Sequence, residues 1–426
     1  MDINQLYKLF KESKGISTDT RTLKKGMLFF ALSGENFNGN KFAKAALEHG
    51  AIAAVIDDAD YDSKDCILVK DTLECLQKLA VHHRKQLNTP VIALTGSNGK
   101  TTTKELISSV LSRKFALSST RGNLNNHIGV PLSLLKLKKS TELAVIEMGA
   151  NHQGEIAGLC EIAQPDYGLI TNFGKAHLEG FGGIEGVIKG KSELYDYIKK
   201  QNGILFVNGD DQRQMQKSEG AKRFVFGESN SFDACINFVE ANPFVVVQTQ
   251  DGEIKSQLIG SYNASNISVA IAIGNYFEVP LEKIKEAIEG YCPKNNRSQI
   301  IEKNGQKIIL DAYNANPTSV KAALENFDQM KATSKIVILG DMFEIGKNSV
   351  LEHQQIVDQL EKMQLDFAFV CGEDFAQTKT QSVQQFKTLK ELRKHLQNNT
   401  LPKKGLFLVK GSRGMAMEVV LDDVLI

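Results

Sequence analysis

The chain has 426 residues, 42% of them apolar and 24% charged, so we expect two to four ordinary globular domains. Its formal net charge is +1, from 51 basic and 50 acidic side chains, which favours neither nucleic acid nor an anionic membrane surface as a partner. The first residues lack the apolar core of a signal peptide, no apolar run approaches the roughly 18 residues that span a bilayer, and the cysteines form no C-x-x-C pair, so we expect a cytoplasmic protein with reduced thiols.

The first block of the chain is residues 1–89. It contains strand-like runs at 28–32 and 51–56, with a helical stretch at 41–50 between them and another at 72–87. Pro90 disfavours helix in the residue before it, so we place a domain boundary there.

The second block, residues 90–293, alternates strands with helices. Strands are predicted at 91–96, 143–149, 167–171, 204–208 and 223–226, and a helix at 155–163. This alternation predicts a parallel sheet of the P-loop type, covered on both faces. Residues 244–260 differ, because a D-G pair between two apolar runs predicts a hairpin, and a helix rich in small residues follows at 263–277.

The third block, residues 294–426, repeats the alternation. Strands are predicted at 307–311, 335–340, 367–371 and 405–410, each followed by a helical pattern. That pattern predicts a second doubly wound, Rossmann-like sheet of ordinary domain size. The predicted fold class is therefore α/β with three domains.

Residues 95–101, Thr-Gly-Ser-Asn-Gly-Lys-Thr, stand between a predicted strand and a predicted helix. A standard phosphate loop has its first glycine where this chain has Leu94. Glycines still let backbone N–H groups turn inward, and the helix N-terminus favours an anion. Lys100 could reach the β- and γ-phosphates and Thr101 could bind Mg²⁺; the alternative is a glycine-rich turn with an incidental lysine.

Glu147 ends the apolar run LAVIE. A carboxylate at the carboxyl end of a neighbouring parallel strand would face this loop, where a metal-binding acid usually lies. The alternative is an ordinary acid at a strand end. Beside the phosphate loop, we favour the metal.

Several segments then carry a resemblance to a known family. TGSNGKTT resembles the loop of the Mur ligases and the related folylpolyglutamate synthases. Within the Mur ligases, the segments that resemble the members adding D-alanyl-D-alanine are NLNNHIGVP (123–131), IEMGANHQGEI (146–156), TNFGKAHLEGFGG (171–183), DAYNANPTS (311–319), LGDMFEIG (339–346) and VKGSRGMAMEVV (409–420). STDTR (17–21) resembles the family's uridine-nucleotide site, so the resemblance spans nearly the whole chain.

The resemblance implies one domain for a UDP-sugar peptide, one for ATP and a mobile C-terminal domain. It implies that ATP phosphorylates the terminal carboxylate of UDP-MurNAc-tripeptide and that the amine of D-Ala-D-Ala attacks the acyl phosphate. It also implies two Mg²⁺ ions, and we expect a monomer. Phosphorylation makes chemical sense, because a carboxylate would otherwise have to expel oxide.

The resemblance implies which individual residues of this chain bind ATP and metal. The positions matched to ATP contacts are Gly96, Ser97, Asn98, Gly99, Lys100, Thr101, Thr102, Asn263 and Asn266 near adenine, Arg297, and Asp311 on the ribose. Thr101 and Glu147 match ligands of the first Mg²⁺, and His177 matches a ligand of the second. Lys191, two residues before Glu193, matches a lysine that CO₂ carbamylates in this family. The resemblance therefore implies three catalytic residues: Lys100, His177 and Lys191. A polar loop histidine and a surface lysine are the alternatives for His177 and Lys191.

Substrate contacts are also implied by the resemblance. Those expected for the UDP end are Thr18, Asp19, Thr20 and Arg21, for which an exposed turn is the alternative, and for the pyrophosphate Asn125 and Asn126. Asn314 and Asn316 are expected at the junction with substrate, and Asp341 and Glu344 in the wall around D-Ala-D-Ala.

Four other functions fit the sequence less well. The sister Mur ligase that adds a diamino acid usually carries D-N-P-R, which this chain lacks, and STDTR argues against a folylpolyglutamate synthase. A GTPase-type switch would need N-K-x-D, which is absent, and a P-loop kinase would not need the third domain.

Overall fold

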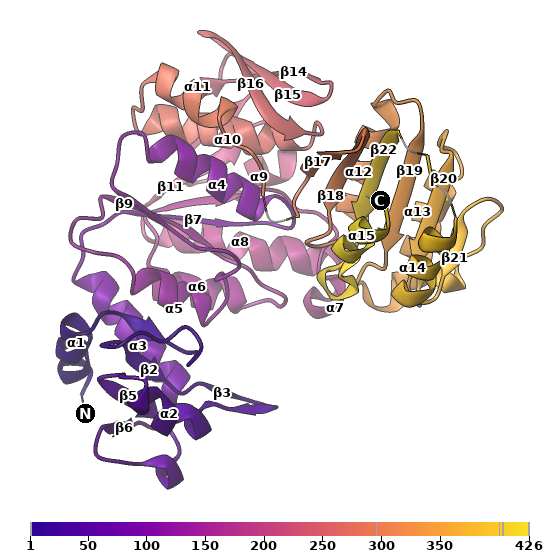
Figure 1. Ribbon diagram of the computed structural model, residues 1–426. Coiled ribbons are helices and arrows are strands. Elements are labelled where there is room, and N and C mark those ends of the chain that lie inside the picture. The colour runs from indigo at the N-terminus through magenta and orange to yellow at the C-terminus, as the bar shows by residue number, and fades with distance from the viewer. Residues whose placement is uncertain (1, 295, 400, 403, 425–426) are drawn as a thin grey trace.

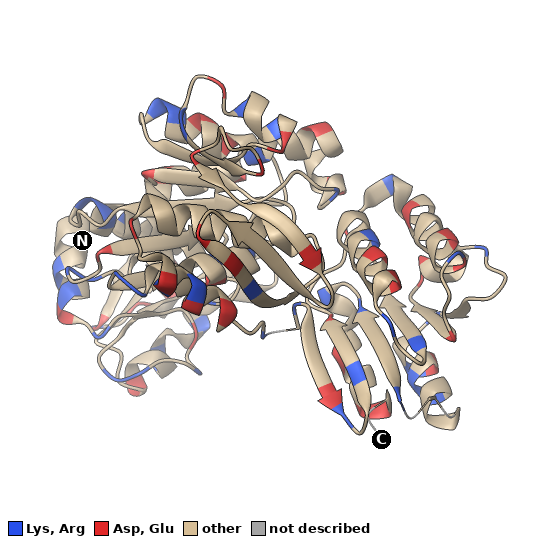
Figure 2. Cartoon of the chain, turned by 90° about the horizontal axis from the view of Figure 1, so that it is seen from above, with Lys and Arg blue, Asp and Glu red and all other residues tan. Residues whose placement is uncertain are grey.

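The computed structural model describes residues 2–294, 296–399, 401–402 and 404–424. Three α/β units follow one another along the chain (Figure 1): an N-terminal unit from α1 to α3, a central unit from β7 to α11, and a C-terminal unit from β17 to α15. Basic and acidic side chains are interspersed over all of them (Figure 2). The predicted α/β fold with three domains is confirmed.

The N-terminal unit is built on a parallel sheet. Its strands, in spatial order, are β1 (Ile16–Ser17), β2 (Leu28–Phe30), β5 (Ala53–Ile56) and β6 (Cys66–Leu68). Its helices are α1 (Ile3–Glu12), α2 (Ala43–Glu48) and α3 (Thr72–Lys85), and a small hairpin joins β3 (Ser33–Gly34) to β4 (Phe37–Asn38). Leu28 and Phe30 face a core shared with the central unit, whereas Phe29 faces α2, as the two-residue period of a strand requires.

The central unit contains a sheet of seven strands, all parallel. Their spatial order is β13 (Ala234–Cys235), β12 (Lys222–Gly227), β11 (Ile204–Asn208), β10 (Tyr167–Ile170), β7 (Val91–Thr95), β9 (Leu143–Glu147) and β8 (Leu117–Ser119). Val91 and Ala93 of β7 pack into the core on one face, and Ile92 and Leu94 into the core on the other. This two-sided burial explains the unbroken apolar run.

The helices of the central unit cover both faces of that sheet. They are α4 (Lys100–Leu111), α5 (Gly129–Leu134), α6 (Glu155–Ala163), α7 (Leu178–Phe181), α8 (Ile184–Lys200), α9 (Gln212–Lys217), α10 (Asn263–Tyr276) and α11 (Leu281–Glu289). None of the helices in the described residues is both long and apolar enough to cross a membrane. Because β7, β9 and β10 are parallel neighbours, the loops after them meet at one edge of the sheet.

The predicted hairpin at 244–260 is present as β15 (Phe244–Thr249) and β16 (Gly252–Ile259). A third antiparallel strand, β14 (Asn237–Ala241), extends it and was not predicted. The exposed Phe238, Val239 and Glu240 explain the omission, because this strand shows no alternation of apolar and polar residues.

The C-terminal unit contains the second doubly wound sheet. Its strands, in spatial order, are β17 (Gln299–Lys303), β18 (Gln306–Asp311), β22 (Gly405–Lys410), β19 (Lys335–Gly340), β20 (Phe367–Cys371) and β21 (Gln384–Phe386), and β17 is antiparallel to β18. Its helices are α12 (Pro317–Gln329), α13 (Ser349–Leu360), α14 (Leu389–Asn398) and α15 (Leu421–Val424). The last strand, β22, lies between β18 and β19, so the loops after these three strands are neighbours.

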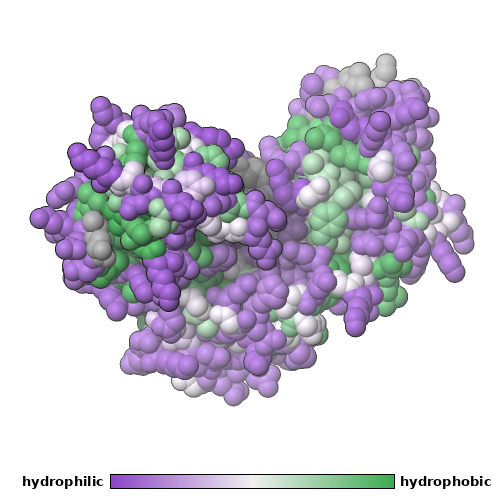
Figure 3. Space-filling model, turned by 90° about the horizontal axis from the view of Figure 1, so that it is seen from below, coloured by the Kyte–Doolittle hydropathy of each residue, from purple (hydrophilic) through white to green (hydrophobic). Residues whose placement is uncertain are grey.

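The C-terminal unit docks on the loop that follows β10. Lys175 of this loop binds Glu352 of α13 (2.6 Å), and its backbone N–H donates to Thr318 Oγ1 (3.0 Å). Asn316 Nδ2 donates to Asn98 Oδ1 (2.7 Å). The molecular surface is hollowed between the C-terminal unit and the rest of the molecule (Figure 3).

Candidate active site

The phosphate loop, residues 95–101, joins the end of β7 to the start of α4. Gly96 and Gly99 have φ angles of +143° and +79°. A Cβ atom at Gly96 would lie 2.0 Å from Thr171 Oγ1, and one at Gly99 would lie 2.7 Å from Asn266 Oδ1. Both glycines are therefore required for conformation and for space.

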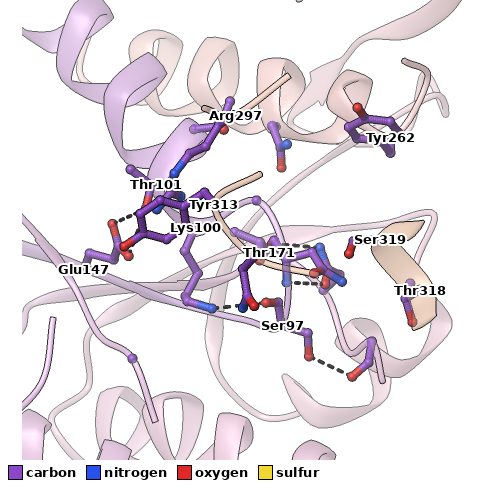
Figure 4. A pocket seen from close by; sticks show the side chains of 18 of the residues that line it. Ser97, Lys100, Thr101, Glu147, Thr171, Tyr262, Arg297, Tyr313, Thr318 and Ser319 are labelled. Atoms are coloured by element: carbon purple, nitrogen blue, oxygen red, sulfur yellow. Dashed lines mark hydrogen bonds between the residues drawn. The ribbon is translucent and has the colours of Figure 1, made fainter. Parts of the chain in front are cut away.

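Lys100 is the first residue of α4, and its ammonium folds back over the loop (Figure 4). Nζ donates to Gly96 O (2.6 Å) and Ser97 O (3.1 Å). Burial lowers the pKa of Lys100 to about 8, an effect that Glu147 opposes and Arg297 reinforces. The nearby cation of Arg297 shows that positive charge from two units converges on this loop.

Glu147 ends β9 and is 1% exposed. Thr101 Oγ1 lies 3.1 and 3.0 Å from its carboxylate oxygens, and Asn125 Nδ2 donates to Oε1 (2.8 Å). Lys104 Nζ lies 3.6 Å from Oε2. This hydroxyl and carboxylate are suitable oxygen ligands for Mg²⁺. Since the described residues contain no group of three or more His, Cys, Asp or Glu side chains that could hold a metal, phosphate and water oxygens would have to complete the shell.

Two asparagines of α10 lie on the other side of the phosphate loop. Asn266 Oδ1 accepts from Thr103 Oγ1 (3.0 Å), and its amide donates to Asn263 Oδ1 (2.8 Å). Asn263 Nδ2 donates to Ile259 O (2.8 Å). Neither side chain forms a capping hydrogen bond at the start of α10.

The C-terminal unit contributes an arginine and an ion pair. The Arg297 guanidinium carbon lies 3.7 Å from the centroid of the Tyr313 ring. Asp311 Oδ2 accepts from Lys410 Nζ (2.6 Å), and Lys410 also donates to Asn314 O (3.1 Å). Lys410 was not among the predicted site residues, although a lysine at the end of an apolar strand is the same kind of signal as Glu147.

These residues border one cavity of about 780 Å³ between the central and C-terminal units. Its volume is in the range of ordinary ligand pockets. Residues of both units that line it are the phosphate loop from Ser97 to Thr102, together with Asn125, Asn126, Glu147, His177, Asn263, Asn266, Arg297, Asp311, Asn314 and Lys410. Figure 4 shows Lys100 and Thr101 of the central unit facing Arg297 and Tyr313.

Some of the expected substrate residues are occupied by structural hydrogen bonds. Asn126 Oδ1 accepts from Ile128 N and Gly129 N at the start of α5. Asn316 Oδ1 caps α12 by accepting from Ser319 N (2.9 Å), although its amide reaches Asn98.

The two acidic residues of the 339–346 segment differ from each other. Asp341 is 4% exposed, does not line the cavity, and accepts from Asp374 N and Phe375 N (3.0 Å each). Glu344 is exposed and contacts His177 Nδ1 across the unit boundary. This contact lowers the pKa of Glu344.

The predicted uridine residues lie away from the cavity, in the turn after β1. Arg21 has a side chain 87% exposed and binds Asp19 (2.7 Å), while Thr18 and Thr20 are half-buried. This turn is at the carboxyl end of a parallel strand, where ligands of α/β sheets usually bind.

Models of three Mur ligase domains match the chain. They are the Mur ligase family catalytic domain over residues 12–84, the Mur ligase middle domain over 94–274, and the glutamate ligase domain over 296–413. A Bacillus subtilis protein named UDP-N-acetylmuramoyl-tripeptide–D-alanyl-D-alanine ligase is 34% identical over 426 residues, covering 96% of this chain and 93% of its own length.

The expected carbamylation of Lys191 is wrong, because that modification belongs to other Mur ligases and not to those that add D-alanyl-D-alanine. Lys191 lies in α8, is 1% exposed and does not line the cavity. Its amine donates to Ala150 O (3.1 Å) and lies 4.8 Å from the centroid of the Phe181 ring. Burial holds the pKa of this amine well below its usual value.

Two solved structures are also similar to this chain. MurF from Acinetobacter baumannii has a TM-score of 0.88 and 33% identity, covering 99% of this chain and 98% of its own. MurF ligase from Thermotoga maritima, solved in complex with ADP, has a TM-score of 0.85 and 26% identity, with 98% of each chain covered. The chain belongs to the Mur ligase family.

Proposed function

We propose that this protein is an ATP-dependent ligase that joins D-alanyl-D-alanine to UDP-MurNAc-tripeptide in peptidoglycan precursor synthesis. The observation that carries the proposal is the cavity in which the phosphate loop faces Arg297 and Asp311 of another unit. The relatives that match over nearly the full chain add the substrate class. The alternative of a diamino-acid-adding ligase is not favoured, because relatives 34–35% identical over nearly the full chain are named D-alanyl-D-alanine ligases.

The residues of the cavity suit transfer of a phosphoryl group to a carboxylate. Backbone N–H groups of the phosphate loop and the N-terminus of α4 would bind the triphosphate. Lys100 and Arg297 would stabilise the negative charge on the γ-phosphate from opposite units. The acyl phosphate then has phosphate as its leaving group, and the amine of the dipeptide displaces it.

The nucleoside would lie between the two units. Asn263 and Asn266 would border the adenine, and Asp311, held by Lys410, would accept from the ribose hydroxyls. Because Arg297 and Asp311 come from the C-terminal unit, ATP would bind fully only when that unit is docked.

Thr101 and Glu147 would hold one Mg²⁺, and His177 would contribute to a second. Bound there, the metal would neutralise charge on the β- and γ-phosphate oxygens. Thr101 and Asn125 already orient the Glu147 carboxylate, so the chain itself supplies this arrangement.

The remaining assignments concern the UDP end of the substrate, the domain boundaries and the cellular compartment. The turn from Thr18 to Arg21 would bind the UDP end, and Asn125 and Asn126 would lie near the pyrophosphate. We take residues 1–89, 90–293 and 294–426 as the three domains. The six cysteines are all free thiols, which supports a reducing compartment such as the cytoplasm.

The test is phosphate release with each substrate omitted in turn, together with intact mass of the product. We expect release to require ATP, UDP-MurNAc-tripeptide and D-Ala-D-Ala together, and the product to gain the mass of the dipeptide less one water. Lys100→Ala should lower turnover at least about 100-fold, because a charge-stabilising donor is lost. Lys78→Ala, at an exposed ion pair on α3, is the control. A rate of phosphate release that is the same with and without D-Ala-D-Ala would refute the proposal.

A further inference from the structure

The acceptor dipeptide of the proposed reaction carries three recognisable features: an amine that reacts, two methyl groups, and a terminal carboxylate. An extended chain spans at most about 3.6 Å per residue, so this carboxylate lies within about 7 Å of the reacting amine. A cation near the cavity, on the C-terminal unit, would be needed to bind it. The inference below rests on the proposed function.

Two loops of the C-terminal unit lie next to residues that line the cavity, since one follows Lys410 and the other contacts His177 through Glu344. The β19 loop is residues 341–345 and the β22 loop is residues 411–415. Phe343 N donates to Ser412 Oγ (2.8 Å), and Ser412 N donates to Asp341 O (3.1 Å). The two loops therefore form one surface at the carboxyl ends of adjacent strands, where α/β sheets bind ligands.

This surface is close to the reacting groups. Glu344 contacts His177, which lines the cavity, and Phe343 is its neighbour in the chain. Ser412 Oγ lies 3.5 Å from Ala315 O, and the next residue, Asn316, donates to Asn98 of the phosphate loop. One layer of residues thus separates the two loops from the triphosphate site.

The acids and cations of this surface differ in whether they can reach a ligand. The Asp341 carboxylate is turned inward onto backbone N–H groups, and Lys410 is 1% exposed and held by Asp311 and Asn314. Arg413, in contrast, has a side chain that is 62% exposed. Its Nη1 donates to Glu418 Oε1 (2.7 Å), which fixes the guanidinium and leaves its other N–H groups free to bind a second carboxylate.

An apolar side chain accompanies this arginine. Phe343 is 45% exposed, and its ring lies against Gly414, where a Cβ atom would come within 2.8 Å of Phe343 Cε2. Gly414 thus keeps the ring beside Arg413. Figure 3 shows apolar surface on the C-terminal unit where it borders the hollow.

We propose that Arg413 binds the terminal carboxylate of the acceptor dipeptide and that Phe343 packs against its methyl groups. Glu418 positions the guanidinium from behind. The site would then select an acceptor that ends in a free carboxylate, and would select against one whose distal end is a cation.

The experiment compares D-Ala-D-Ala with D-alanyl-D-alaninamide, which lacks the carboxylate, at saturating ATP and UDP-MurNAc-tripeptide. We expect the wild-type protein to prefer the acid by about 10- to 100-fold in kcat/KM, as for a charge-assisted hydrogen-bonded pair. Arg413→Gln should raise the KM for D-Ala-D-Ala by a similar factor, reduce the preference for the acid to about threefold or less, and leave the KM for ATP unchanged.

Two further variants separate charge from packing and from general damage. Phe343→Ala should raise the KM for both dipeptides by about the same factor, since it removes apolar contact and no charge. Arg113→Gln, at an exposed arginine in the turn after α4, should behave as wild type. Because Arg413 is exposed, its variant should melt at the wild-type temperature.

Two results would overturn the assignment: no preference for the acid in the wild-type protein, or a full wild-type preference in Arg413→Gln. A wild-type protein that joins neither dipeptide to the tripeptide would instead overturn the proposed function, and the assignment with it. The two failures are distinct, because only the second abolishes product with every acceptor.

Discussion

Replacing Lys410 by Met would test how the C-terminal unit holds its part of the nucleotide site. Lys410 is 1% exposed and makes two hydrogen bonds, to Asp311 Oδ2 (2.6 Å) and to Asn314 O (3.1 Å). Methionine has a similar length and volume, so the change removes the charge and both donors without leaving a large cavity. Among the described residues, Ser298 N would remain as a hydrogen-bond donor to Asp311 (3.1 Å).

The size of the effect follows from the exposure of the two partners. Removing one member of a fully buried ion pair costs about 3–5 kcal/mol, since the other charge remains without compensation. The Asp311 side chain is 18% exposed and can regain some water, which places the expected loss at about 2–3 kcal/mol. For a domain of this size, that loss should lower Tm by about 6–9 °C.

Thermal melting of Lys410→Met, Asp311→Asn and the double variant would measure this coupling. We expect the double variant to be more stable than the sum of the single losses predicts, by at least about 1 kcal/mol, because each single change isolates its partner. Lys307→Met is the control in the same sheet, where an ion pair with Glu302 at 3.4 Å is largely exposed. If Lys410→Met melted within about 2 °C of the wild-type protein, the reasoning on the buried pair would be wrong.

Two other predictions concern the Arg297 stack and the junction of the first two units. Tyr313→Leu should lower kcat about tenfold while Tyr313→Phe retains it, because the ring face, 3.7 Å from Arg297, holds that cation in place. Steady-state phosphate release would measure both values of kcat. Equal losses of kcat in the two variants would contradict the prediction. His83 is buried in its neutral form, accepting from a tyrosine of α1 and donating to a carbonyl after α5, and burial lowers its pKa below the ordinary value of 6.5. As pH falls, the His83 imidazole is therefore protonated in the unfolded chain before it is protonated in the folded one, so the free energy of unfolding should fall as pH drops through 6.5. His83→Asn should reduce this pH dependence, which urea titrations at pH 7.5 and 5.5 would measure.

The sheets that position the site were predictable because their strands are buried on both faces. Val91 to Leu94 form an unbroken apolar run because each residue faces one of two cores. The strands that were not predicted are short edge strands, such as β17 and β21, with half-exposed residues. Such segments are held mainly by pairing with a neighbour distant in sequence, so they carry little periodic signal of their own.

The same distinction applies to the site. Lys100 and Glu147 could be predicted because each belongs to a local pattern of strand end and loop. The pairing of Asp311 with Lys410 joins residues 99 positions apart, and that of Asn98 with Asn316 joins residues 218 apart. Asp341 was expected to face the dipeptide because it is an acid in a matched motif, and only the fold shows its carboxylate bound to two backbone N–H groups.

The loop after β10 gives a physical reason for combining phosphoryl transfer and amide formation in one closed arrangement. Within this loop, Phe173, Gly174 and His177 line the cavity, while Lys175 binds Glu352 of the C-terminal unit. Glu352 is largely buried, so undocking the C-terminal unit would leave its carboxylate without this cation. The contacts that place Arg297 at the phosphate loop therefore also hold the β19 and β22 loops next to the cavity in which the acyl phosphate would form. Since an acyl phosphate is readily hydrolysed, an enzyme that forms it only when the acceptor loops are in place limits its loss to water.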